Sequence, residues 1–362
     1  SYNNDDRGWA NYLGEGWNLI LDRDWFMGEF IWAGIDYLGE PCDYGANKSG
    51  LKTPNTTFCG AYDSAGFAKD SAYYWRSIWN EDSYTANMLP GTWNKDEVTI
   101  DKNGFVPVMV YSNADKVEVV LNGKVVGEAT ATLVKTSSSD KTNYSRREWA
   151  VSVVDSALCN DSKLVADTTT NDFTHLFVQM YVKYVEGTLE LKSYKLVNGE
   201  YELITDAKGT QFVETTEGIT DVKITQTATA LTADKNDIVY YAVDAVDKDG
   251  DFVNGYNGKV TFTLEGEGEI IGADNGSSIN IDRGCSDFVV SADKKSATTS
   301  CYNGKCLLAV KATDEAGDFT VTATAYDEAA GTTVVATKEA DAVVTTEDTV
   351  ADEWEEIVEQ HV

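Results

Sequence analysis

The sequence is poor in the residues on which several common chemistries depend. Only two of its 362 residues are histidines, His175 and His361, and none of its cysteines forms a Cys-x-x-Cys pair. A structural zinc site and a serine–histidine–aspartate triad both need such residues at suitable spacing. We therefore expect no metal, no cofactor and no histidine-dependent catalysis in this chain.

Positive charge is also scarce. The chain has 29 lysines and arginines against 60 aspartates and glutamates, a formal net charge of −31 at pH 7 that is spread along its length. Such a surface repels polyanions, so nucleic acid and anionic membranes are excluded as expected partners. No run of apolar residues approaches the roughly 20 that a membrane-spanning helix needs.

The cysteines are few but even in number, and they allow 15 pairings, so connectivity stays open. A disulfide between Cys42 and Cys59 would close a loop that contains glycine, proline and asparagine, and would stabilise the fold by about 3 kcal/mol. Together with several glycosylation sequons, this favours an extracytoplasmic or secreted protein. Ser1 opens without a charged or apolar leader, so either a leader was removed or the chain is the later part of something longer. The six positions are Cys42, Cys59, Cys159, Cys285, Cys301 and Cys306.

A short apolar stretch at residues 26–35 is the most distinctive element near the start. Its composition predicts a strand buried on both faces of a parallel sheet. Polar side chains return where that strand would end, with Trp32, Asp36, Tyr37 and Glu40. An indole face can stack on a sugar ring while a carboxylate accepts its hydroxyls, so these residues are candidates for a sugar site. A core tryptophan followed by a solvated loop is the alternative.

A helix is predicted over residues 69–79, with Ala72, Trp75, Arg76 and Trp79 on one face that we expect to join the core. The acidic residues Glu29, Asp36 and Glu40 could take part in hydrolysis by paired carboxylates, but one strand and its loop supply at most one wall of such a site. The apolar strand also needs parallel neighbours that the rest of the chain does not provide.

From residue 82 onward the sequence changes to alternating strands, which indicates two β-sandwich domains. The pairs Asn122-Gly123, Asn198-Gly199 and Asn303-Gly304 predict type I′ hairpin turns, because both positions of that turn need positive φ. We expect four parts, with the second sandwich of the immunoglobulin type: a first domain over 1–81, a β-sandwich over 82–217, an immunoglobulin-like β-sandwich over 218–345, and an acidic tail over 346–362.

Three segments in the same order resemble one known family. The first comprises DRDWFMGEFIWAGIDYLGEP (22–41) and FCGAYDSAGFAKDSAYYWRSIW (58–79), and closely resembles the end of the catalytic barrel in family-two glycoside hydrolases of the β-galactosidase type. The second, with LPGTWNKD and VMVYSNADKVEVVLNGKVVGEA, resembles the β-sandwich that follows this barrel. The third, from IVYYAVDAVDKDGD (238–251) to residue 276, resembles the next, immunoglobulin-like domain.

The resemblance implies a mainly β fold, in which the end of a (β/α)8 TIM barrel is followed by two immunoglobulin-like β-sandwiches. It implies part of a retaining glycosidase that hydrolyses terminal β-galactosides, with both catalytic glutamates on barrel strands that would precede Ser1. Trp32 matches the floor of the terminal-sugar subsite, Asp36 and Tyr37 lie in the matching loop, and Phe58 matches an aromatic residue near that subsite. No catalytic residue is thus expected here, and the chain alone should be inactive.

The partners implied are a β-galactoside or related glycan and the upstream part of the same enzyme, which would carry the catalytic barrel. A homo-oligomer is left open. Two other classes also stay open: a carbohydrate-binding module and a structural cell-surface protein, each built of tandem immunoglobulin-like domains.

Overall fold

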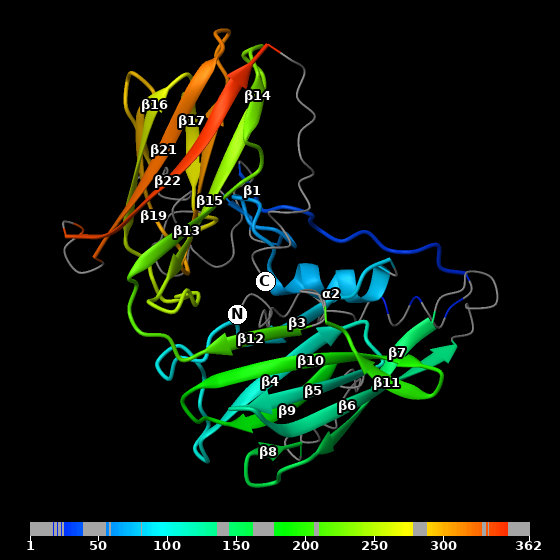
Figure 1. The fold of residues 1–362 in the computed structure, drawn as a ribbon. Coiled ribbons are helices and arrows are strands. Elements are labelled where there is room, and N and C mark those ends of the chain that lie inside the picture. The colour runs from blue at the N-terminus through cyan, green and yellow to red at the C-terminus, as the bar shows by residue number, and fades with distance from the viewer. Residues whose placement is uncertain are drawn as a thin grey trace, which may run out of the picture. The chain divides into compact units, whose positions relative to one another are not determined.

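The computed structural model describes residues 25–38, 56–57, 59–80, 82–135, 145–161, 177–205, 210–277, 288–327 and 333–346, with residues 17, 20, 23 and 331. The chain divides into two compact units. The first unit combines residues 1–31 with 68–215, and the second combines residues 32–67 with 216–362. Figure 1 shows that strands dominate both units.

The first unit is built around two antiparallel sheets that enclose one apolar core. The smaller sheet has the order β3 (Ala86–Leu89), β4 (Phe105–Ser112), β9 (Val178–Lys183) and β8 (Cys159–Asn160). The larger has the order β11 (Glu200–Leu203), β10 (Thr188–Val197), β5 (Lys116–Leu121), β6 (Lys124–Lys135) and β7 (Ser145–Val153), and β12 (Thr210–Glu214) also pairs with β10.

Turn chemistry and a buried tryptophan explain why this part of the sequence folds as it does. The predicted hairpins are confirmed: Asn122 and Gly123 have φ of 50° and 79° between β5 and β6, and Asn198 and Gly199 have 52° and 90° between β10 and β11. Trp93 is fully buried, and its indole N–H donates to the carbonyl of Val185 at 2.8 Å. A buried indole needs such an acceptor, since an unpaired donor is costly.

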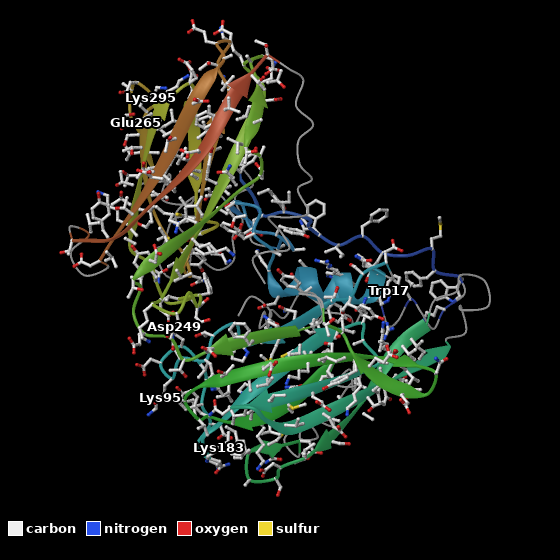
Figure 2. All side chains as sticks on the ribbon, in the orientation of Figure 1. Trp17, Lys95, Lys183, Asp249, Glu265 and Lys295 are labelled. Carbon is white, nitrogen blue, oxygen red and sulfur yellow. The ribbon has the colours of Figure 1, made fainter. Side chains whose placement is uncertain are left out.

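Helix α2 (Asp70–Trp79) is confirmed, and its predicted core face is confirmed in part. Ala72 is buried and Trp75 packs against the cluster of Tyr74, Leu89 and Tyr111. Tyr73 and Tyr74 are buried rather than Trp79, which is 44% exposed. Tyr74 lies edge-on to Tyr111 of β4, with ring centroids 5.3 Å apart. The helix therefore packs its tyrosine face on the small sheet. Trp79 instead contacts Trp75 and Trp17, and Trp17 is labelled in Figure 2.

The second unit is also a sandwich of two sheets around its own core. One sheet has the order β13 (Asp221–Gln226), β15 (Ile238–Val246), β20 (Lys305–Lys311) and β17 (Glu269–Asp274). The other has the order β14 (Ala230–Thr232), β22 (Val334–Thr345), β21 (Gly317–Tyr326), β16 (Lys259–Gly266), β19 (Ser296–Ser300) and β18 (Val289–Val290).

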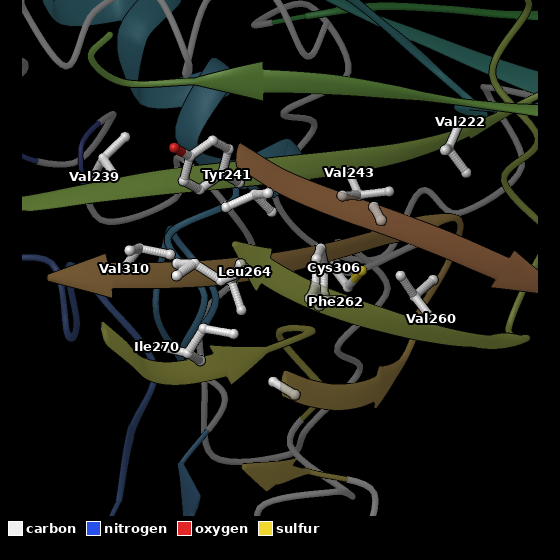
Figure 3. Packing of buried hydrophobic residues seen from close by; sticks show 14 of the residues in the cluster. Val222, Val239, Tyr241, Val243, Val260, Phe262, Leu264, Ile270, Cys306 and Val310 are labelled. Carbon is white, nitrogen blue, oxygen red and sulfur yellow. The ribbon is translucent and has the colours of Figure 1, made fainter. Parts of the chain in front are cut away.

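Alternation along the strands directs apolar side chains into this second core. In β16, Val260, Phe262 and Leu264 are buried and the residues between them are more exposed. Figure 3 shows these side chains together with others of the cluster, Cys306 among them. Period-two patterning of this kind is what a half-buried strand requires. The sandwich part of the expected fold is thus confirmed.

The expected end of a barrel is not formed by the described residues. The segment 26–35 was predicted as a buried strand, yet Phe26, Met27, Phe30 and Ile35 are 46%, 105%, 103% and 57% exposed. One isolated parallel bridge joins Ile35 to a neighbouring loop, and β1 (Tyr37–Leu38) pairs antiparallel with β2 (Thr56–Thr57). A barrel strand is buried only when parallel neighbours flank it, and among the described residues this segment has only the single bridge at Ile35.

The three boundaries expected between the four parts stay predictions, and the tail beyond residue 346 lies outside the described residues. Among those that are described, no helix has the length and apolar character needed to cross a bilayer.

Two adjacent isoleucines of β17 allow the second core to be tested. Ile270 is 1% exposed and Ile271 is 42% exposed, on opposite faces of one strand. Ile270→Ala should lower the free energy of unfolding by about 2–5 kcal/mol, because it leaves a cavity. Ile271→Ala should change it by roughly 0.5 kcal/mol or less. Urea unfolding of both variants measures this, and equal losses would contradict the burial described here.

Candidate functional site

Residues 33–36 form a continuous backbone interaction with residues 59–62. Four hydrogen bonds of 2.9–3.1 Å join the two segments, and Ile35 and Tyr62 form the parallel bridge. Both segments belong to the second unit. Backbone hydrogen bonds to residues 59–62 therefore stabilise the loop that carries the predicted sugar-site residues.

Gly60 permits this close approach. A Cβ atom at Gly60 would lie 2.2 Å from the amide nitrogen of Asp36 and 2.5 Å from the carbonyl oxygen of Tyr62. Backbone atoms cannot move aside as a flexible side chain can, so only glycine fits. Sequence reasoning missed this residue, since nothing in the run CGAYD reveals that another segment passes so close.

Trp32 presents an exposed indole with a fixed orientation. Its side chain is 73% exposed, and its N–H donates to the hydroxyl of Tyr37 at 3.0 Å. The two rings meet edge-on, with centroids 6.2 Å apart and an interplanar angle of 84°. The peptide bond between Trp32 and Ala33 is cis. The tyrosine thus orients the tryptophan while the indole remains exposed, as a flat apolar ligand surface requires.

Asp36 is fixed by the same contact that Gly60 makes possible. Its Oδ1 accepts a hydrogen bond from the amide of Gly60 at 2.8 Å, and the side chain is partly buried. The structure therefore brings Trp32, Asp36 and Tyr37 into one short loop. Phe58, Glu40 and Cys42 lie outside the described residues, so the role of Phe58 and the disulfide of Cys42 with Cys59 stay predictions.

Glu29 has a different environment, in the first unit. Burial raises its pKa above the ordinary value, and its Oε1 has no hydrogen-bond partner within the described part of the chain. Burial, with the charge of Glu29 as a smaller cause, also raises the pKa of Tyr74. One carboxyl oxygen of Glu29 is therefore shielded from water without a hydrogen-bond partner in the described part of the chain, which is costly, while the neighbouring Met27 and Phe30 are exposed.

The described residues contain no group of three or more acidic, histidine or cysteine side chains that could hold a metal ion. The chemistry that Trp32, Tyr37 and Asp36 can perform is recognition: an apolar face, a hydroxyl and a carboxylate on a rigid loop.

Known protein families match both sandwiches. The family model described as glycoside hydrolase family 2 C-terminal domain 5 matches residues 222–334, and the domain of unknown function DUF4982 matches residues 103–154. Among curated proteins, beta-galactosidase BoGH2A of Bacteroides ovatus is 26% identical over 329 residues, which cover 90% of this chain and 30% of that protein. A putative beta-glucuronidase of Formosa agariphila is 40% identical over 112 residues, which cover 31% of this chain and 10% of that protein.

Solved structures share the fold. A family 2 glycosyl hydrolase of Bacteroides cellulosilyticus has a TM-score of 0.61 at 19% identity, and the match covers 91% of this chain and 37% of that one. A beta-glycosidase of Bacteroides vulgatus has a TM-score of 0.59 at 19% identity, covering 88% of this chain and 31% of that one. At such identity the likeness concerns fold alone.

Two glycines of the loop test its geometry. Gly60→Ala should weaken the contact between residues 33–36 and 59–62 by about 1–3 kcal/mol, because the new Cβ overlaps backbone. Gly34→Ala is the matched control, since a Cβ there meets nothing within 4 Å. Amide hydrogen exchange at Ala61 and Tyr62 should accelerate in the first variant and not in the second. Unchanged exchange in Gly60→Ala would refute the close approach.

The chain spans about a third of the length of the relatives that it matches over most of its own length. One family model matches residues of the first sandwich and the other matches residues of the second. The two curated relatives with similar sequences are both named as glycosidases. The chain therefore carries C-terminal domains of glycoside hydrolase family 2 and is related to the glycosidases of that family.

Proposed function

We propose that this chain is the C-terminal part of a retaining β-galactosidase-like glycoside hydrolase that acts on terminal β-D-galactosides in carbohydrate catabolism. The single observation that carries the proposal is the loop of Trp32, Tyr37 and Asp36, with an exposed, hydrogen-bonded indole beside a fixed carboxylate. A sugar offers both an apolar face and hydroxyl groups, and this loop complements both. The name of the Bacteroides ovatus relative supports the choice of galactoside.

Each residue has a distinct role in this proposal. The indole of Trp32 forms the floor on which the terminal sugar stacks, and Tyr37 holds that indole in orientation. Asp36 accepts sugar hydroxyls, and Phe58 supplies a second aromatic contact. The catalytic glutamates belong to the upstream part of the enzyme, so the 362-residue chain alone is inactive.

The segment around Glu29 is the surface on which the upstream part packs. Trp25, Met27 and Phe30 are 75%, 105% and 103% exposed, and burying each large apolar side chain contributes about 1.5–3 kcal/mol. With parallel strands beside it, this segment takes up the strand conformation of a barrel and Glu29 gains polar partners. The enzyme is extracytoplasmic or secreted in this proposal, which the sequons and cysteines support.

The activity test uses the native protein that contains this chain. We expect its intact mass to exceed that of the 362 residues, or a second chain to co-purify, and we expect hydrolysis of an aryl β-galactoside rather than an aryl β-glucuronide. Trp32→Ala should lower kcat/KM about 2- to 10-fold through lost stacking. Tyr201→Ala, an exposed aromatic residue of β11, is the control and should leave kcat/KM unchanged.

Preference for the glucuronide would refute the galactoside assignment. A native protein of 362 residues without activity would refute the enzyme assignment as a whole.

A second candidate function, carbohydrate binding by the first sandwich, is favoured by one surface. Tyr201 pairs with Leu196 and Phe212 pairs with Glu190, positions of equal parity on β10, so both rings lie on the outward face of the sheet. They are 42% and 56% exposed. If this face binds glycans, Tyr201→Ala should reduce retention on a glycan array while hydrolysis persists. Equal retention of the variant would exclude this function for the surface.

The unpartnered apolar segment predicts self-association of the isolated chain. Replacing Met27 and Phe30 by serine should shift the chain toward a monomer, because exposed apolar area drives contact between copies. Light scattering at several concentrations measures this. The matched control replaces Leu133 and Val154, which are 56% and 53% exposed elsewhere, and should have a smaller effect. A monomeric parent chain would contradict the packing surface proposed above.

A further inference from the structure

Two cysteines meet at a corner of the second sandwich where the chain passes from one sheet to the other. Cys301 follows β19, and its amide donates to the carbonyl of Gly258 at 2.8 Å, which keeps it beside β16 of the six-stranded sheet. Cys306 lies in β20 of the four-stranded sheet, opposite Val243 of β15. A covalent link between these cysteines would therefore join the two sheets.

A tight turn between the two cysteines brings them close together. Tyr302 and Lys305 exchange two backbone hydrogen bonds, of 2.9 and 3.2 Å, around the turn residues Asn303 and Gly304. Extending this register by one residue would make Cys301 and Cys306 a non-hydrogen-bonded pair, at the point where the two strands enter different sheets. Such pairs have Cα atoms about 4.5 Å apart, and disulfides span Cα distances of about 4.4–6.8 Å.

The residues of this turn favour its backbone conformation. Asn303 and Gly304 have φ of 50° and 81°, the positive values of a type I′ turn. A Cβ at Gly304 would lie 2.5 Å from the carbonyl oxygen of Val253, so glycine is required there for space as well as conformation. The proximity of the two cysteines therefore follows from the backbone conformation of this turn.

The two sulfur atoms are already in contact inside the core. Their separation is 3.7 Å, and the side chains are 3% and 0% exposed. A disulfide needs about 2.05 Å, so the sulfurs must approach by about 1.7 Å for the bond to form. Cys159 offers a contrast: its sulfur lies 3.8 Å from the thioether of Met180 rather than from a thiol.

We propose that Cys301 and Cys306 form a disulfide that ties the two sheets of the second sandwich at this corner. The oxidant is a disulfide, either a small molecule or an oxidised dithiol protein. One cysteine thiolate attacks it, forms a mixed disulfide and releases one thiolate, which takes up a proton. The second cysteine thiolate then attacks the mixed disulfide and releases the other thiolate. Two thiols are thereby oxidised and one disulfide is reduced to two thiols.

The surroundings indicate when this exchange takes place. Burial raises the pKa of Cys301 well above its ordinary value, the neighbouring Cys306 and Asp244 raise it further, and Lys305 opposes them. Since the thiolate is the attacking species, the closed sandwich reacts slowly. The bond therefore forms while the domain folds, before the corner is buried.

Peptide mapping of the wild-type chain tests the proposal. The chain is unfolded and reduced, refolded with reduced and oxidised glutathione, alkylated and then digested with trypsin. Lys295, Lys305 and Lys311 are cleavage sites, so the two cysteines fall on separate peptides, residues 296–305 and 306–311. We expect these peptides to be recovered linked, with a mass lower by two hydrogen atoms than the sum of the reduced peptides. Recovery of both as alkylated monomers, or linked to other cysteines, would overturn the proposal.

Thermal unfolding provides an independent readout. Dithiothreitol should lower the midpoint of the second sandwich by about 5 °C, because reduction removes a constraint on the unfolded chain. Cys159→Ala is the matched control and should retain both the linked peptides and the shift. Joint replacement of Cys301 and Cys306 by alanine should abolish the shift. A midpoint shift that persists in the double variant would show that another disulfide causes it, and would count against the proposal. If the double variant does not fold, the peptide map of the wild-type chain still shows whether Cys301 and Cys306 are linked.

Discussion

A β-strand leaves its backbone N–H and C=O groups unpaired until a neighbouring strand lies beside it, and its apolar side chains gain nothing until a second layer covers them. The two sandwiches of this chain satisfy both needs internally. Strands such as β16 pair on both sides and send Phe262 into a closed core. The segment around Phe30 satisfies neither, so its apolar side chains remain exposed. This single difference separates the two closed sandwiches from the exposed apolar segment.

The candidate sugar loop lies directly after that unpartnered segment. Its local geometry is nevertheless fixed, because residues 33–36 pair with residues 59–62 and Gly60 leaves room for the contact. Trp32 and Asp36 are thus oriented by backbone hydrogen bonds and by Tyr37 rather than by a surrounding core. The orientation of these side chains is therefore set within the loop, as a preorganised recognition site requires.

The second sandwich has a different weak point, namely the corner where the chain changes sheets. Layers in a sandwich are held together by side-chain packing, whereas strands within each sheet share backbone hydrogen bonds. Cys301 and Cys306 sit at such a change of layer, with their sulfurs in contact. A covalent bond there would supplement the side-chain packing that holds the two sheets together.

The sequence by itself determined the hairpins, helix α2 and the two sandwiches, because Asn-Gly turns and period-two patterning depend on local stereochemistry and on which face of a strand is apolar. It also identified Trp32, Asp36 and Tyr37 as neighbours, since they follow one another along the chain. Only the tertiary structure decided that Tyr74 rather than Trp79 is buried, that Gly60 must lack a side chain, and that residues 26–35 are exposed. Those facts depend on contacts between segments distant in sequence. An apolar run in a sequence indicates that its burial is favourable. Which other segments cover it depends on the rest of the fold.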